Sequence, residues 1–149
     1  LIDLNDTQPY DDFASTPVGE DWFIYPEFTF NRILEEVDEF ISVPKMKCHW
    51  SCGVTHSLKN LVGLVPARFY QTDPRHSHRS GFHGTEQEMG TRLPRVIVDL
   101  NRARPIDLAL MPDGRLAIAD GQGVSVQIFT PDGAYVYWRG EVTSLRWDG

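Results

Sequence analysis

Two lysines, two histidines, a threonine and an asparagine lie between Lys47 and Gly63, within seventeen residues of an otherwise acidic chain. Chemistry on phosphates or carboxylates needs cations, an imidazole and backbone N–H groups held close together. This segment therefore predicts a site for a small anion, with Lys47, His49 and Lys59 as candidate catalytic residues. The candidate ligand-binding residues are Gly53, Thr55, Asn60, Gly63 and Arg68.

A strand and a helix are expected to position these groups. The apolar run from Phe40 to Pro44 is typical of a buried strand that ends at proline. A helix from Thr55 to about Leu64 would place Thr55, His56, Lys59, Asn60 and Gly63 on one face, at about 100° per residue. Leu58, Leu61 and Val62 would then pack inward on the opposite face. Both lysines would thus meet at the mouth of one pocket.

Each of these residues also has a plainer interpretation. Lys47 and Lys59 could be solvated surface lysines, and His49 could be a hydrogen-bonded structural histidine. His56 fits the solvent edge of the helix, and Thr55 fits an N-cap. Asn60 competes with the backbone inside a helix, which favours a specific partner for its side chain.

A second polar segment, residues 73–84, carries three histidines and two arginines. His76, His78 and His83 could hold a metal, but no fixed carboxylate or thiol completes the set. The segment could instead close over a bound anion, or be a solvated loop. These three alternatives stay open.

The remaining N-terminal elements follow from apolar spacing. A short strand is expected at Trp22–Tyr25, followed by a helix near residues 30–37 with Thr29 as its N-cap. Ile33, Leu34 and Val37 would form its buried side. Residues 96–100 fit a helix or a strand, and periodicity does not decide between them.

After Pro105 short alternating strands begin, separated by two Pro-Asp-Gly turns nineteen residues apart. Such spacing is typical of an antiparallel β meander. The chain is therefore expected to divide into an α/β anion-binding domain at 1–105, partial in extent, and a meander at 106–149. The predicted fold class is α/β, a small mixed sheet with flanking helices followed by this meander. Val142–Trp147 would start a further strand.

Composition limits the function classes. With 149 residues and 41% hydrophobic content, the chain can bury one ordinary core. Residues 1–40 have net charge −10, residues 41–104 have +6, and residues 105–149 have −3. A basic centre between acidic ends favours a small anionic ligand over duplex nucleic acid, unless the acidic lead simply folds over it. The edge of the meander could also serve a protein partner or self-association.

Location is inferred from what the sequence lacks. No apolar run has the roughly 20 residues of a membrane-spanning helix, and the N-terminus does not have the pattern of a signal peptide. A soluble, cytoplasmic protein without membrane contact is expected. The absence of an initiator methionine suggests a processed chain or a fragment. The two cysteines, Cys48 and Cys52, are interpreted as free thiols, although a disulfide or metal role stays open.

Two resemblances add to these expectations. Residues 38–108 carry the pattern V-P-K-x-K-x-H followed by G-V-T-x-x-x-K-N-x-x-G, and they resemble a domain-of-unknown-function family of bacteria and archaea whose members often accompany ferredoxin-type modules. The resemblance implies an α/β domain with Lys47, His49, Thr55, Lys59, Asn60 and Gly63 at its marker positions. The iron–sulfur association does not transfer, because a cubane cluster takes four thiolates. Residues 106–149 resemble one blade of an NHL-type β-propeller, which leaves a junction of two origins near Pro105 open.

The sequence therefore predicts an uncharacterised α/β domain that binds a small anionic ligand or cofactor through a phosphate or carboxylate. Whether it is an enzyme, and which cofactor it uses, stay open. The alternative is a noncatalytic interaction module that uses the edge of the meander, or a chain without a complete active site.

Overall fold

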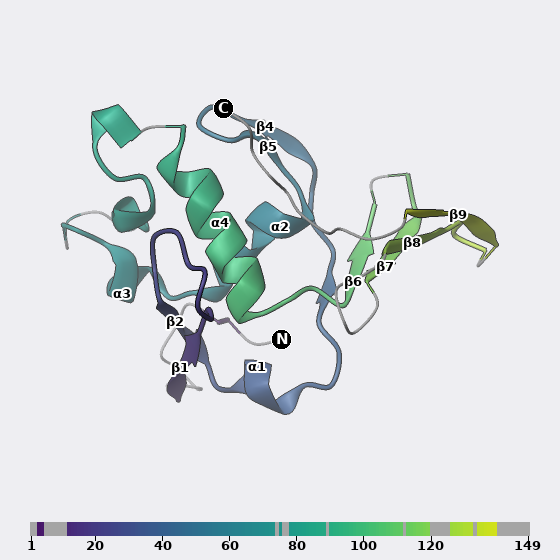
Figure 1. The fold of residues 1–149 in the computed structure, drawn as a ribbon, viewed down its shortest axis with the longest axis horizontal. Coiled ribbons are helices and arrows are strands. Elements are labelled where there is room, and N and C mark those ends of the chain that lie inside the picture. Colours follow the sequence, from purple (N-terminus) through teal and green to yellow (C-terminus); the bar gives the residue numbers. More distant parts are fainter. Residues whose placement is uncertain are drawn as a thin grey trace.

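The structure, a computed structural model, describes residues 3–4, 12–73, 75, 78–88, 90–111, 113–119, 126–132 and 134–139. Its elements form two hairpins, a mixed five-stranded sheet and several helices (Figure 1). In chain order they are β1 Phe13–Pro17, β2 Glu27–Asn31, α1 Ile33–Glu36, β3 Ile41–Ser42, β4 Lys47–His49, β5 Gly53–Thr55, α2 Ser57–Asn60, the 3-10 helix η1 Leu61–Leu64, α3 Ala67–Tyr70, the 3-10 helices η2 Ser80–Phe82 and η3 Glu86–Glu88, α4 Arg92–Ala103, β6 Leu108–Leu110, β7 Leu116–Ala119, β8 Val126–Phe129 and β9 Tyr135–Arg139. The predicted mixed α/β class is confirmed.

Helix α4 organises the core. Leu93, Val96, Ile97, Leu100 and Ala103 are buried at the three- and four-residue spacing of one helical face. Residues 96–100, for which the sequence allowed either a helix or a strand, are therefore part of a helix. Pro94 lies in the first turn of α4, where backbone N–H groups have no partner within the helix, so the proline is tolerated.

Aromatic and aliphatic side chains from the preceding elements complete the core against α4. Phe28 and Phe82 are fully buried, and their rings meet edge to face with centroids 6.1 Å apart. The other buried apolar residues that join them are Val18, Phe30, Leu34, Leu61, Leu64 and Val65. Figure 1 shows α4 crossing the middle of the molecule, with β1 and β2 beside one end and β4 and β5 beside the other.

The five-stranded sheet has the order β3-β6-β7-β8-β9. Strands β6 to β9 pair antiparallel as the predicted meander, and Gly114 adopts φ +84° in the first turn, where a residue without Cβ is favoured. Strand β3 pairs parallel to β6, with Ile41 opposite Leu108. The boundary predicted after residue 105 thus separates strands of one sheet, and the division into two units stays a prediction. The likeness to a β-propeller blade also stays a prediction, because Val142–Trp147 lies outside the described residues.

Three predicted N-terminal features are wrong. Trp22–Tyr25 is a bend between β1 and β2 rather than a strand. Thr29 is not an N-cap, because it lies in β2 opposite Ser15, and the short helix α1 begins only at Ile33. Of the inward positions predicted for that helix, Leu34 is buried, whereas Val37 is 40% exposed.

The strand predicted from Phe40 to Pro44 is shorter and less buried than expected. Only Ile41 and Ser42 form β3, at the edge of the sheet. Ser42 faces inward, while Ile41 and Val43 are 55% and 63% exposed. Alternation along an edge strand directs these two apolar side chains away from the core.

The helix predicted at 55–64 also differs. Thr55 belongs to strand β5, α2 covers only Ser57–Asn60, and the chain then tightens into η1. Because a 3-10 helix turns further per residue than an α-helix, the predicted faces do not hold. Leu61 is buried as expected, but Leu58 is 49% exposed. No helix of the described residues is long and apolar enough to cross a membrane.

Candidate functional site

The hairpin of β4 and β5 brings four of the predicted site residues together. Lys47 lies opposite Thr55, and His49 lies opposite Gly53. Because side chains alternate along a strand, these four positions share one face, and the cysteine between Lys47 and His49 lies on the other. Gly53 adopts φ +72°, which an L side chain rarely takes, and so allows the sharp return of the chain.

The loop of this hairpin fixes the His49 imidazole. The Ser51 backbone N–H donates to Nδ1 of His49 over 3.3 Å, and the Ser51 hydroxyl lies 3.2 Å from the same nitrogen. Because Nδ1 accepts a hydrogen bond, the neutral ring carries its proton on Nε2. Burial lowers the pKa of His49 below its ordinary value of 6.5, and the positive charges of Lys59 and Lys47 lower it further. His49 is therefore a neutral donor at pH 7.

Lys59, on α2, is half-buried beside the hairpin. Burial lowers the pKa of its ammonium group, Cys52 opposes that shift, and Lys47 and Arg79 add to it by repulsion. Neither Lys47 nor Lys59 forms an ion pair with any described residue. The two predicted lysines thus lie near enough to repel each other.

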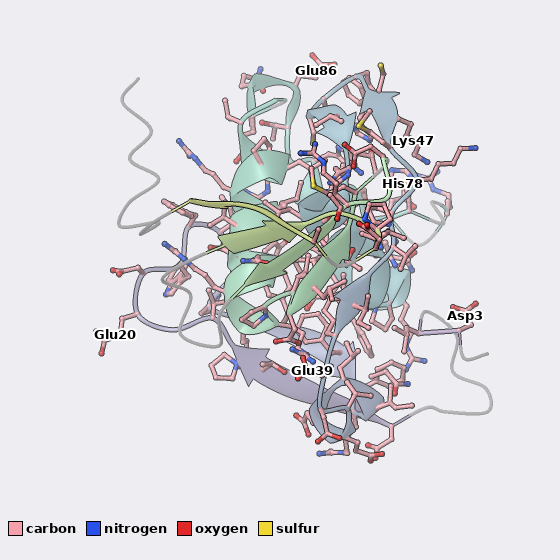
Figure 2. The ribbon with its side chains drawn as sticks, turned by 90° about the vertical axis from the view of Figure 1, so that its right-hand side faces the viewer. Asp3, Glu20, Glu39, Lys47, His78 and Glu86 are labelled. Atoms are coloured by element: carbon pink, nitrogen blue, oxygen red, sulfur yellow. The ribbon has the colours of Figure 1, made fainter. Side chains whose placement is uncertain are left out.

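His83, which follows η2, joins the same group from another part of the chain. Burial lowers the pKa of His83, and charge on His49, His78 and Lys59 lowers it further. We call Lys47, His49, Lys59 and His83 the cationic cluster, after the charge of its two lysines. Figure 2 shows the labelled Lys47 and His78 along one edge of the molecule, on the side of the β4–β5 hairpin. His83, from the predicted polar loop, therefore lies beside the hairpin, with its ring centroid 6.2 Å from that of Trp50.

Two buried polar atoms beside this cluster have no hydrogen-bond partner among the described residues. They are Oγ1 of Thr55 and Nε2 of His56. Thr55 is only 8% exposed, and it lies on the hairpin face that carries Lys47. A buried hydroxyl without a partner costs free energy, so a group that it can bind is expected there. His56 stands at the N-cap position of α2 without capping it, and its Nδ1 lies 3.2 Å from the Ser57 hydroxyl.

Asn60 and Gly63 lie further along the same segment. The Asn60 amide donates to Ser42 Oγ over 3.4 Å and so ties α2 to β3. This contact supplies the specific partner expected for an asparagine in a helix. Gly63 is exposed, and a Cβ there would meet nothing within 4 Å, so a close backbone approach does not explain this glycine. The ligand-binding role predicted for both residues stays a prediction.

Arg68 is not brought to the cluster. It lies on α3, where its guanidinium stacks over the rings of Phe13 and Phe69 at 4.8 Å and 4.6 Å. Figure 1 shows α3 and the β4–β5 hairpin well apart. Arg68 therefore has a packing role at another surface, and its predicted part in ligand binding stays a prediction.

Two residues that sequence reasoning did not single out contribute to the site. Arg79 donates through Nε to the Val65 carbonyl, and through Nη2 to the Gly63 carbonyl over 3.4 Å, so it holds the polar loop against η1. Trp50 is 72% exposed at the tip of the hairpin, between His49 and Ser51 in the chain. The signal that could have found it is a large aromatic residue directly after the V-P-K-x-K-x-H pattern.

The predicted metal set stays a prediction. His78 and His83 approach with ring centroids 6.5 Å apart, while His76 lies outside the described residues. Among the residues that the structure describes, no group of three or more histidine, cysteine or acidic side chains is placed to hold a metal ion. Cys48 and Cys52 are free thiols, Cys48 exposed and Cys52 half-buried.

Comparisons with known proteins identify the family. No curated protein and no solved structure matches the chain. The model of the family described as Domain of unknown function (DUF362) matches residues 1–128, a range that includes the cationic cluster and extends past Pro105 into β8. Since this match covers well over half of the sequence, the chain belongs to the DUF362 family of domains of unknown function.

Proposed function

We propose that this domain binds a small oxyanion, a phosphate or a carboxylate, on the face formed by the β4–β5 hairpin and α2. The observation that carries the proposal is that the Lys47 side chain, the half-buried Lys59 and the imidazoles of His49 and His83 come together, and that Lys59 lowers the pKa of both imidazoles. Among the described residues, the charged groups that shift the pKa values of His49, Lys59 and His83 include no carboxylate. A bound anion would replace this repulsion by attraction.

The four donors of the proposed site would act in different ways. Lys59 is partly desolvated, so its interaction with an anion is stronger than that of a fully hydrated lysine. Lys47 is exposed and contributes mainly longer-range attraction. The Thr55 hydroxyl gains the partner that it lacks, and His49 donates from Nε2.

The same geometry bears on catalysis. A general base must offer a free lone pair to the proton that it removes. At His49 the lone pair of Nδ1 is engaged by Ser51, and Nε2 carries the proton of the neutral ring. His49 therefore suits the binding of an anion better than proton abstraction, and the proposal extends to binding only.

Titration calorimetry with inorganic phosphate and with malonate tests the proposal. Lys59→Gln removes the half-buried charge and should weaken binding about tenfold or more, as for the loss of a charge-assisted hydrogen bond. Lys45→Gln is the matched control, because Lys45 is exposed in the loop before β4. Equal affinities of the parent and of Lys59→Gln for both anions would contradict the proposal.

A second candidate function is supported by the position of β9. This strand is an edge of the five-stranded sheet in the order that the structure describes, and an open edge can accept a strand from another chain. We infer that the chain self-associates through this edge. Analytical ultracentrifugation of the chain and of Val136→Pro, which removes a backbone donor of β9, tests this role. An oligomer that survives the substitution would contradict it.

A further inference from the structure

The most exposed aromatic side chain near the cationic cluster is Trp50, and the structure leaves most of its surface open. Its exposed fraction is 72%. An indole ring is a large apolar surface, and it gains free energy when a partner covers it. The ring stands directly beside two imidazoles of the cluster, because His49 precedes it in the chain and His83 lies next to it in space.

The orientation of this ring is shared with two imidazoles. The Trp50 plane lies 16° from that of His49, with centroids 6.5 Å apart, and 3° from that of His83, with centroids 6.2 Å apart. Because Trp50 is 72% exposed, these two imidazoles leave most of the indole uncovered. The three rings are nearly parallel and come from two separate segments of the chain.

We propose that the ligand of this site is a mononucleotide, whose base stacks on Trp50 while its phosphate meets Lys47 and Lys59. This inference rests on the proposed function, because it places the phosphate in the same oxyanion site. A flat heteroaromatic ring matches an exposed indole, and stacking on an aromatic side chain tolerates any base. The adjacent cations supply the charge that the phosphate requires.

A free nucleotide fits this site better than a nucleic-acid strand. The cluster offers only two lysines, and the chain as a whole has net charge −7, which repels the successive phosphates of a strand. Nucleic-acid grooves follow the backbone with extended positive charge. A single phosphate next to one stacked ring is the ligand that this arrangement accommodates.

Four probes separate the ring from the phosphate. Adenosine 5′-monophosphate carries both, ribose 5-phosphate lacks the ring, adenosine lacks the phosphate, and inorganic phosphate lacks both ring and sugar. Calorimetry should find that the nucleotide binds at least about fivefold more tightly than ribose 5-phosphate, the gain expected for one stacked base. Oligoadenylate serves as a fifth probe and should bind no more tightly per site than the mononucleotide.

Substitutions then test whether the tighter binding of the nucleotide depends on Trp50 and the affinity for the phosphate on Lys59. Trp50→Ala should remove the preference for the nucleotide over ribose 5-phosphate and leave the affinity for ribose 5-phosphate unchanged. Trp22→Ala is the matched control, because Trp22 is also exposed, at 47%, but lies in the bend between β1 and β2. Lys59→Gln should weaken both phosphorylated probes equally.

The outcomes that overturn the inference differ from those that overturn the oxyanion site. If the nucleotide and ribose 5-phosphate bind equally in the parent, and Lys59→Gln weakens both, the nucleotide assignment is wrong and the oxyanion site stands. If neither phosphorylated probe binds but malonate does, the nucleotide assignment alone is wrong. If malonate also fails to bind, or if Lys59→Gln changes no affinity, both proposals are wrong. Tighter binding of oligoadenylate per site would overturn the mononucleotide in favour of a strand.

Discussion

The packed region around α4 and the region around the β4–β5 hairpin treat buried polar groups in opposite ways. Asp99, on α4, is fully buried, yet its carboxylate accepts backbone N–H groups from Phe23, Ile24 and Tyr25 at 2.9, 2.7 and 3.1 Å. Thr55, in the hairpin, is 8% exposed, and its hydroxyl has no partner among the described residues. One region satisfies a full charge, whereas the other leaves a neutral hydroxyl unsatisfied.

This difference agrees with the proposal that the α4 region serves stability and that the hairpin region binds a ligand. Folded proteins satisfy most buried polar groups, and Asp99 follows that rule, although Nε of Arg104 at the C-cap of α4 has no partner among the described residues. The hairpin departs from it at Thr55 and also gathers lysines, and no described carboxylate raises the pKa of Lys59. Unsatisfied donors and repelling cations destabilise a fold, and they are commonly retained where a ligand uses them. The following predictions test the contrast, beginning with the largest expected effect.

Phe28→Ala should cause the largest loss of stability. The ring is fully buried against Phe82, so truncation removes apolar contacts and leaves a cavity. We expect the free energy of unfolding to fall by about 3–5 kcal/mol, as urea denaturation would measure. Phe69→Ala is the control, because Phe69 is 45% exposed and should cost much less. Similar losses for the two variants would mean that the core lies elsewhere.

Asp99→Asn should destabilise the chain by about 2–3 kcal/mol, because an amide cannot accept all three N–H groups with its single oxygen. The same urea measurement checks this value. Asp38→Asn, at an exposed position between α1 and β3, should change stability little. If Asp99→Asn were as stable as the parent, the three hydrogen bonds of Asp99 would not stabilise the α4 region.

Thr55→Val should act in the opposite direction. It keeps the shape of the side chain and removes the hydroxyl without a partner, so stability without ligand should rise by about 1 kcal/mol or less. Phosphate binding should weaken in the same variant. Thr16→Val in β1 controls for the higher strand propensity of valine. A clear loss of stability at Thr55 would show that its hydroxyl already has a structural partner.

Lys59→Gln should produce the smallest effect, a rise in the pKa of His49 toward its ordinary value of 6.5, because a repelling charge is removed. Ring resonances followed by NMR against pH would show it, with Lys45→Gln unchanged. Since the folded pKa of His49 lies below that of the unfolded chain, this residue reduces stability as pH falls through 6.5. The substitution should lessen that acid sensitivity. If the titration of His49 did not change, the charge of Lys59 would not act on the His49 imidazole.

The sequence predicted the local parts of the fold best. The meander followed from alternating residues and the two Pro-Asp-Gly turns, and β6 to β9 match it closely. Lys47, His49 and Lys59 were expected at one site, which stays a prediction, and a hairpin and one helical turn carry them rather than a strand end and a long helix.

The missed features depend on contacts between distant segments. The three N–H groups that Asp99 binds lie 74–76 residues away, so the bend at residues 22–25 could not be read from local pattern. Thr55 has the residue type of an N-cap, but pairing with Lys47 places it in a strand. Trp50 and His83 become neighbours only through folding, and no spacing rule connects them.

The parallel pairing of Ile41 with Leu108 has a consequence for the order of folding. Successive hairpins in the meander need only short loops to close, whereas β3 can dock on β6 only after the long intervening segment has become compact. Early in folding, β6 should therefore form an unpaired edge of the meander, and β3 should pair with β6 late. Because β3 leads directly into the hairpin of the cationic cluster, we expect that cluster to assemble among the last parts of the molecule.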